Sequence, residues 1–193
     1  MKEVLFVQGA GRGVHEEWDI KLVESLRREL GPRYEVRYPR MPNEADPKLA
    51  AWQPALEKEF ASLRHGAILV GHSVGGTILI NVLAESAPAA RLDAIVVIAA
   101  PFIGKRGWSS EDIAPRADLA ARLPEAVPIF LYHGEDDAIV PVAHVELYAE
   151  AIPRAQVRRL AGRDHQMNNS LSEVASDIRR LEPRAPRRKG ARS

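Results

Sequence analysis

Short apolar runs alternate with helical patterns along almost the whole chain, and this alternation constrains the fold more than any other feature. The runs that we expect to form buried strands are residues 4–7, 34–38, 67–70, 94–99, 129–132 and 156–160. Such alternation predicts an α/β fold, a three-layer sandwich of about six mostly parallel strands with helices on both faces. Right-handed crossovers place the loops that follow the strands at one edge of the sheet, which is where ligands bind.

The helical patterns carry apolar stripes that we interpret as core-facing. The first helix ends at Gly31-Pro32, the second follows Asp46-Pro47, a third starts at Pro141, and the last spans 171–181. The stripes of the first two are Trp18, Leu22, Leu26 and Leu30, then Trp52, Leu56, Phe60 and Leu63. The longest irregular stretch, 101–128, predicts a small cover over a site or a loop with a short surface helix.

Length and composition predict one domain. With 193 residues and 46% apolar composition, the chain can bury one core, which we place in residues 1–182. Residues 183–193 hold five basic side chains and no acidic one, and we expect a disordered basic tail. Removing these five charges from the net charge of +1 leaves −4 for the rest. A body of that sign is unsuited to nucleic acid, whose binding depends on neutralising phosphates.

Cysteine usage and hydropathy set further limits. The chain has no cysteine, which excludes a thiol nucleophile and a thiolate metal site. The N-terminal apolar run stops at Gly9, too early for a signal-peptide core or a membrane span. We therefore expect a soluble, cytoplasmic protein, and its oligomeric state stays open.

A serine lies between a predicted strand and a predicted helix. Residues 71–76 read Gly-His-Ser-Val-Gly-Gly, directly after the apolar run 67–70. At such a sharp corner side chains near the serine would collide with backbone, and Gly71 and Gly75 remove them. The alternative without a catalytic role is a Gly-rich turn that happens to contain a serine. The surrounding strand and helix favour Ser73 as a nucleophile.

A serine hydroxyl barely ionises at neutral pH and needs a base held by a carboxylate. After the predicted strand 129–132 the sequence reads His-Gly-Glu-Asp-Asp-Ala-Ile-Val-Pro, which offers Asp136 and Asp137. After the strand 156–160 it reads Ala-Gly-Arg-Asp-His, which offers His165. The order serine, acid, histidine is that of the α/β-hydrolase arrangement.

These three segments resemble the nucleophile elbow, acid loop and histidine loop of α/β-hydrolase-fold serine hydrolases, in a compact form that lacks the fold's usual first two strands. The resemblance covers roughly residues 1 to 182. It assigns the acid to Asp137, because the family's aspartate precedes Val-Pro by a short spacer, and Asp136 is then a turn residue. Tyr38-Pro39 and Trp52 are similar to residues of the small serine hydrolases akin to retinoblastoma-binding protein 9.

Acyl transfer also needs two backbone donors for an oxyanion. The resemblance implies the N–H of Val74 and one from the loop after the first strand, for which we choose Ala10. Gln8 stands where the family commonly has histidine. The glycines at 9, 11 and 13 lack the Gly-x-Gly-x-x-Gly spacing of a dinucleotide site. Arg12 could meet a substrate carboxylate, although a solvated arginine is the simpler interpretation.

The other five histidines have no metal-ligand spacing, so we expect no metal and no cofactor. The sequence thus predicts a serine hydrolase that cleaves small carboxylic esters or thioesters through Ser73, His165 and Asp137. Two alternatives remain open: a non-catalytic hydrolase-like binding protein, and an acyltransferase or perhydrolase with the same triad.

Overall fold

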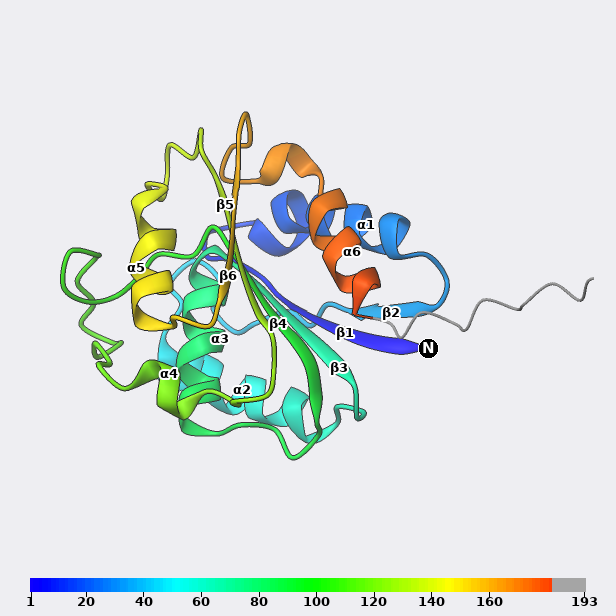
Figure 1. Cartoon of the computed structure of the whole chain (residues 1–193), viewed down its shortest axis with the longest axis horizontal. Coiled ribbons are helices and arrows are strands. Elements are labelled where there is room, and N and C mark those ends of the chain that lie inside the picture. The colour runs from blue at the N-terminus through cyan, green and yellow to red at the C-terminus, as the bar shows by residue number, and fades with distance from the viewer. Residues whose placement is uncertain (182–193) are drawn as a thin grey trace, which may run out of the picture.

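The computed structural model describes residues 1–181, and its centre is one six-stranded sheet (Figure 1). The strand order is β2-β1-β3-β4-β5-β6, and every neighbouring pair is parallel. The strands are β1 (Lys2–Val7), β2 (Tyr34–Arg37), β3 (Ala67–His72), β4 (Leu92–Ile98), β5 (Ile129–Gly134) and β6 (Gln156–Leu160). The predicted α/β sandwich and its six strands are therefore confirmed, and all of the strands run the same way.

Helices cover both faces of this sheet. On one face α1 (Asp19–Leu30) packs against α6 (Ser172–Arg180), and Figure 1 shows both on the same side. On the other face lie α2 (Leu49–Ala61), α3 (Ser73–Glu85), α4 (Leu119–Arg122) and α5 (Ala143–Ala151). Two short turns precede α1 and α6, a π-helical turn η1 (Val14–Trp18) and a 3₁₀ turn η2 (Met167–Asn169).

The sheet divides the core into two apolar layers. Alternate residues of each strand point to opposite faces, so Leu5 and Leu69 join the layer under α2 and α3, and Phe6 and Ile68 join the layer under α1 and α6. Strands buried on both faces read as continuous apolar runs, as β3 and β4 do. This burial fixes the carboxyl edge of the sheet as a rigid platform for the loops.

Trp18 departs from the sequence interpretation. Leu22, Leu26 and Leu30 are buried as expected, but Trp18 is 51% exposed. It ends the π-helical turn and precedes α1 with φ −111° and ψ −69°, which breaks the helical phase with Leu22. The expectation that Trp18 faces the core is therefore wrong.

The irregular stretch 101–128 contains the four-residue helix α4 and an isolated bridge between Ile103 and Trp108. The predicted basic tail, 183–193, lies outside the described residues. Among residues 1–181, no helix combines the length and hydropathy that crossing a membrane requires.

Candidate active site

Ser73 lies at the junction of β3 and α3 with a strained backbone. Its φ of 52° is in the left-handed region, which a residue with a side chain adopts only where its surroundings enforce it. A Cβ on Gly71 would lie 2.6 Å from the Gly76 Cα, and one on Gly75 would lie 1.9 Å from the Gln8 carbonyl oxygen. The absence of a side chain at Gly71 thus permits the sharp turn, and its absence at Gly75 leaves room for the Gln8 carbonyl that follows β1.

The structure brings Ser73, His165 and Asp137 into one chain of contacts. The His165 Nε2 lies 3.0 Å from the Ser73 Oγ, and its Nδ1 lies 2.8 Å from the Asp137 Oδ2. A carboxylate can only accept, so Nδ1 carries the proton and Nε2 is free to accept one from the hydroxyl. This is the geometry and tautomer that a serine nucleophile and its base require.

Asp137 is held as an ionised carboxylate. Burial raises its pKa, but hydrogen bonds from His133, His165 and the Val140 N–H outweigh burial, and the net pKa lies well below its usual range. Its Oδ1 accepts the N–H groups of Ile139 and Val140 at 2.9 and 2.8 Å, and its Oδ2 lies 3.2 Å from the His133 Nε2. A carboxylate fixed in this way stays charged when an imidazolium forms beside it.

Asp136 does not reach this cluster. Its side chain is exposed, and its backbone N–H bonds the Arg163 carbonyl, which joins the loop after β5 to the loop after β6. A Cβ on Gly134 would lie 2.1 Å from the same carbonyl, so the two loops pack at backbone contact.

The proposed oxyanion donors lie beside the serine. Val74 is the second residue of α3, so its N–H has no acceptor within the helix. Ala10 borders the same pocket as Ser73, and among residues 1–181 no hydrogen bond uses its N–H. A Cβ on Gly9, the preceding residue, would lie 3.2 Å from the Ser73 Cβ, which shows how closely this loop approaches.

Glu44 organises the loop that carries Ala10, a role that the sequence did not reveal. Its carboxylate accepts the Gly13 N–H and the Gln8 side-chain amide, each at 3.0 Å, and its carbonyl accepts the Gly11 N–H at 2.7 Å. Gln8, which stands in place of the family's histidine, is fully buried and accepts the Met41 N–H at 3.0 Å. Gln8 therefore supports the loop from the interior and does not line the pocket, which is bordered by the loop residues Gly9, Ala10 and Gly11.

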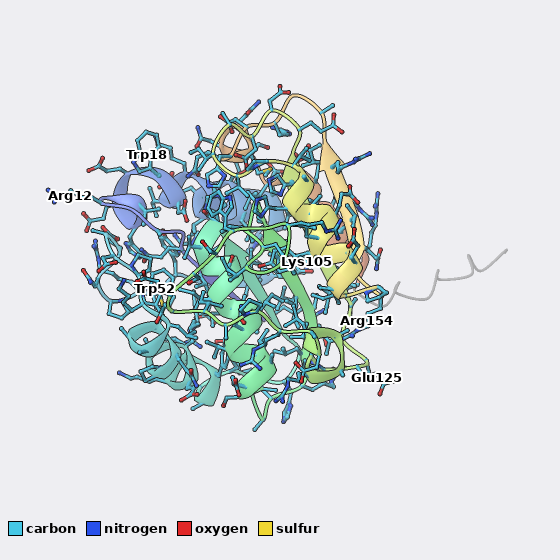
Figure 2. The ribbon with its side chains drawn as sticks, turned by 90° about the vertical axis from the view of Figure 1, so that its left-hand side faces the viewer. Arg12, Trp18, Trp52, Lys105, Glu125 and Arg154 are labelled. Carbon is cyan, nitrogen blue, oxygen red and sulfur yellow. The ribbon has the colours of Figure 1, made fainter. Side chains whose placement is uncertain are left out.

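The pocket in front of Ser73 is apolar and holds about 380 Å³. Among the described residues, four large apolar side chains are exposed, and Trp18, Trp108 and Ile139 all line this pocket. Arg12 is the one residue of basic or acidic type in the lining apart from the two histidines. Figure 2 shows Arg12 and Trp18 at the same end of the molecule. Large exposed apolar groups around a cavity mark a binding site.

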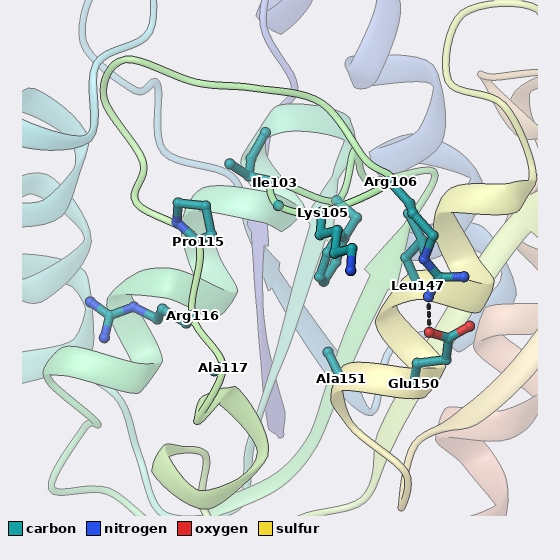
Figure 3. Close-up of a pocket in the computed structure, with 11 residues that line it drawn as sticks. Ile103, Lys105, Arg106, Pro115, Arg116, Ala117, Leu147, Glu150 and Ala151 are labelled. Carbon is teal, nitrogen blue, oxygen red and sulfur yellow. Dashed lines mark hydrogen bonds and ion pairs between the residues drawn. The ribbon is translucent and has the colours of Figure 1, made fainter.

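A second cavity of about 350 Å³ lies between residues 102–106 and α5 (Figure 3). Its cations are largely neutralised: Arg106 pairs with Glu150 as drawn there, and Arg116 pairs with Glu85. Ser73, His165 and Asp137 do not line this cavity. We therefore place the candidate active site in the pocket of Ser73.

Asp19 and His72 form a second buried aspartate–histidine pair, next to that of Asp137 and His165. The His72 Nδ1 lies 3.0 Å from the Asp19 Oδ2, and its Nε2 lies 3.0 Å from the His165 carbonyl oxygen. Within residues 1–181, no group of three or more His, Cys, Asp or Glu is arranged to hold a metal ion. His15 stacks on Tyr38, and the Nδ1 of His144 accepts the Phe102 N–H.

A protein-family model named Serine hydrolase matches residues 6–170. The chain belongs to this serine hydrolase family. No curated protein matches the sequence significantly. The family membership confirms the resemblance drawn from the three loops, whereas the narrower likeness to the retinoblastoma-binding-protein-9 group stays a prediction.

Solved structures share the fold at low sequence identity. The ydeN gene product of Bacillus subtilis is 18% identical, with a TM-score of 0.74 over 94% of this chain and 98% of that one. XC6422 from Xanthomonas campestris, described as an α/β serine hydrolase without a lid, is 18% identical, with a TM-score of 0.67 over 95% and 84%. Est1E from Butyrivibrio proteoclasticus, solved with ferulic acid bound, is 13% identical, with a TM-score of 0.65 over 94% and 88%.

Proposed function

We propose that this family member hydrolyses small carboxylic esters or thioesters through an acyl-enzyme on Ser73. The observation that carries the proposal is the contact series from the Ser73 Oγ to the His165 Nε2, and from the His165 Nδ1 to the Asp137 carboxylate. A binding protein has no need of a hydroxyl, an imidazole and a carboxylate in this order.

The reaction follows from the protonation states. The Ser73 oxygen attacks the acyl carbon while its proton passes to the His165 Nε2, and the carbonyl oxygen becomes an oxyanion beside the N–H groups of Val74 and Ala10. The tetrahedral intermediate collapses, the bond to the alcohol or thiol breaks, and His165 returns the proton to the leaving group. Water then attacks the acyl-enzyme with the same base, which releases the acid and the free serine.

The pocket lining favours an apolar acyl or alcohol group of modest size. Trp18, Trp108 and Ile139 offer wide apolar surfaces, and among the lining residues none is acidic. Est1E, which shares the fold, binds ferulic acid, a small aromatic molecule. We therefore expect aryl and medium-chain esters to react faster than acetates.

A fluorophosphonate tests the proposal directly. The protein is incubated with the reagent, its intact mass is measured, and the adduct is mapped, with Ser73→Ala and His165→Ala treated in parallel. We expect a single adduct on Ser73, none in Ser73→Ala, and a labelling rate at least 100-fold lower in His165→Ala. No adduct in the wild type, together with no turnover of graded aryl esters, would support the non-catalytic binding protein instead.

The same assay separates hydrolysis from acyl transfer. Adding an alcohol or hydrogen peroxide beside water and quantifying the products gives the partition of the acyl-enzyme. Free acid as the main product supports a hydrolase, whereas ester or peracid as the main product supports an acyltransferase or a perhydrolase.

A further inference from the structure

Next to the candidate triad lies a second histidine and aspartate pair that the proposed mechanism does not use. His72 and Asp19 are 1% and 0% exposed, so neither side chain can exchange a lost partner for water. Burying a polar group without a partner costs free energy, and burying an unpaired charge costs more. The protonation of this pair is therefore determined by its contacts within the protein.

Both ring nitrogens of His72 face groups that act as acceptors. The Nδ1 meets the Asp19 carboxyl group and the Nε2 meets the His165 carbonyl oxygen, each at 3.0 Å. A neutral imidazole has one N–H and would point a lone pair at one of these oxygens. Only the doubly protonated ring donates to both.

Asp19 is in turn surrounded by donors. Its Oδ2 accepts the Gly9 N–H at 2.7 Å and its Oδ1 accepts the Gln166 side-chain amide at 3.2 Å. Burial raises the pKa of Asp19, but the charge and hydrogen bond of His72, together with the hydrogen bonds from Gly9 and Gln166, outweigh burial, and the net pKa is lowered. Burial likewise lowers the pKa of His72, but the charge and hydrogen bond of Asp19, together with the His165 carbonyl and the charge of Asp137, outweigh burial, and the net pKa is raised.

These contacts join the loops that the reaction needs. Asp19 is the first residue of α1, Gly9 precedes the proposed donor Ala10, and His72 precedes Ser73. His165 and Gln166 belong to the loop after β6. On the basis of the proposed function, we infer that Asp19 and an imidazolium form of His72 are positioning residues. They hold the loop after β6, which carries His165, and the loop after β1, which carries Ala10, in place around Ser73.

The pair acts through position and not through contact with the reacting atoms. Asp19 does not line the pocket, and His72 borders it but is only 1% exposed, with its two ring nitrogens occupied by Asp19 and the His165 carbonyl oxygen. The titratable groups that face His72 are Asp19 from α1, His165 from the loop after β6 and Asp137 from the loop after β5. A displacement of about 1 Å at a base can lower turnover about 100-fold, so anchoring its backbone carbonyl matters.

Two measurements test the inference. In wild-type protein with ¹⁵N-labelled histidine, NMR should show both ring nitrogens of His72 protonated at pH 7. In Asp19→Asn, one of them should lose its proton, kcat toward an aryl ester should fall about 10- to 100-fold, and KM should change less than threefold. Asp136→Asn is the matched control, because it removes an exposed carboxylate near the site, and it should retain wild-type kcat.

Three results would overturn the inference: a bare ring nitrogen on His72 in the wild type, an unchanged kcat in Asp19→Asn, or a change confined to KM. If Asp19→Asn does not fold, the wild-type spectrum decides. Fluorophosphonate labelling of the wild type is read separately, so loss of the proposed function and loss of this inference remain distinguishable.

Discussion

At the scale of single residues, the assignment of the acid depends on which aspartate reaches the imidazole. Asp137 is buried and contacts the His165 Nδ1 at 2.8 Å, whereas Asp136 is exposed. We predict that Asp137→Asn lowers kcat about 10⁴-fold, because an amide in this position favours the wrong tautomer of the histidine. Steady-state kinetics with an aryl ester measures the effect. A loss of that size in Asp136→Asn with Asp137→Asn active would reverse the assignment.

Trp108 should act on substrate choice and not on the chemical step. Trp108 is 40% exposed and lines the pocket, and its ring packs edge to face on His144 with the ring centroids 5.2 Å apart. We predict that Trp108→Ala lowers kcat/KM about tenfold for a hexanoate or aryl ester, since apolar pocket contacts are worth about 1–3 kcal/mol. The same variant assayed with an acetate ester is the control and should change less than threefold. Equal losses for both esters would contradict the role.

The three residues of the contact series, Ser73, His165 and Asp137, could be singled out from the sequence because each belongs to a local motif. Ser73 lies between glycines at a strand end, and Asp137 and His165 each follow an apolar strand. Asp19 had no such signal. Its partners Gly9, His72 and Gln166 lie 10, 53 and 147 residues away, so only the folded chain places them together.

At the scale of elements, the sequence predicted where strands and helices lie better than how they begin. Trp18 fits the four-residue spacing of α1, but the π-helical turn ahead of Asp19 rotates it out of the core and into the pocket lining. A change from one helical type to another leaves no clear trace in apolar spacing. The conformation of the neighbouring loop, residues 8–13, could not be predicted either, because Glu44, which stabilises it, lies 31 residues beyond Gly13 in the sequence.

Glu44 should control the order of the loop that carries Ala10. We predict that Glu44→Ala lowers kcat about 10- to 100-fold. The Gly13 N–H and the Gln8 amide would lose their acceptor, and the loop would no longer hold the Ala10 N–H, the proposed oxyanion donor, in place. Asp46→Ala is the matched control in the same segment, as its contact with Lys48 is exposed. Hydrogen exchange of residues 9–15 should increase in Glu44→Ala alone. Unchanged exchange would exclude this role.

Gly75 links β1 to the start of α3. We predict that Gly75→Ala lowers the free energy of unfolding by roughly 3 kcal/mol or more, the upper end of the cost of overpacking a core. The reason is that the added Cβ would overlap the Gln8 carbonyl oxygen. Gly31→Ala, where φ is 73° but the space is open, should cost only about 1–2 kcal/mol from the left-handed backbone. Urea unfolding of both variants gives the comparison. Equal losses would mean that the close contact is relieved by small shifts.

At the scale of the whole molecule, the buried charges of the site couple the stability of the fold to pH. Asp19 and Asp137 have lowered pKa values in the folded state, so each stabilises the fold above the ordinary aspartate pKa of about 3.9 and loses this contribution as pH falls through its folded value. His72 has a raised pKa, so its contribution is complete below the ordinary histidine pKa of about 6.5. That contribution is lost as pH rises through the folded value.

Comparison of His72→Gln with the wild type isolates the histidine. The wild type should be the more stable protein at pH 5 to 6, and its advantage in the free energy of unfolding should decrease as pH rises above about 6.5. Urea unfolding at pH 5, 6, 7, 8 and 9 measures the difference at each pH. An advantage of the wild type over His72→Gln that stays constant from pH 5 to 9 would mean that folding does not change the proton affinity of the ring, and an advantage that increases from pH 5 to 7 would mean that the ring is neutral when folded. Either result would contradict the prediction.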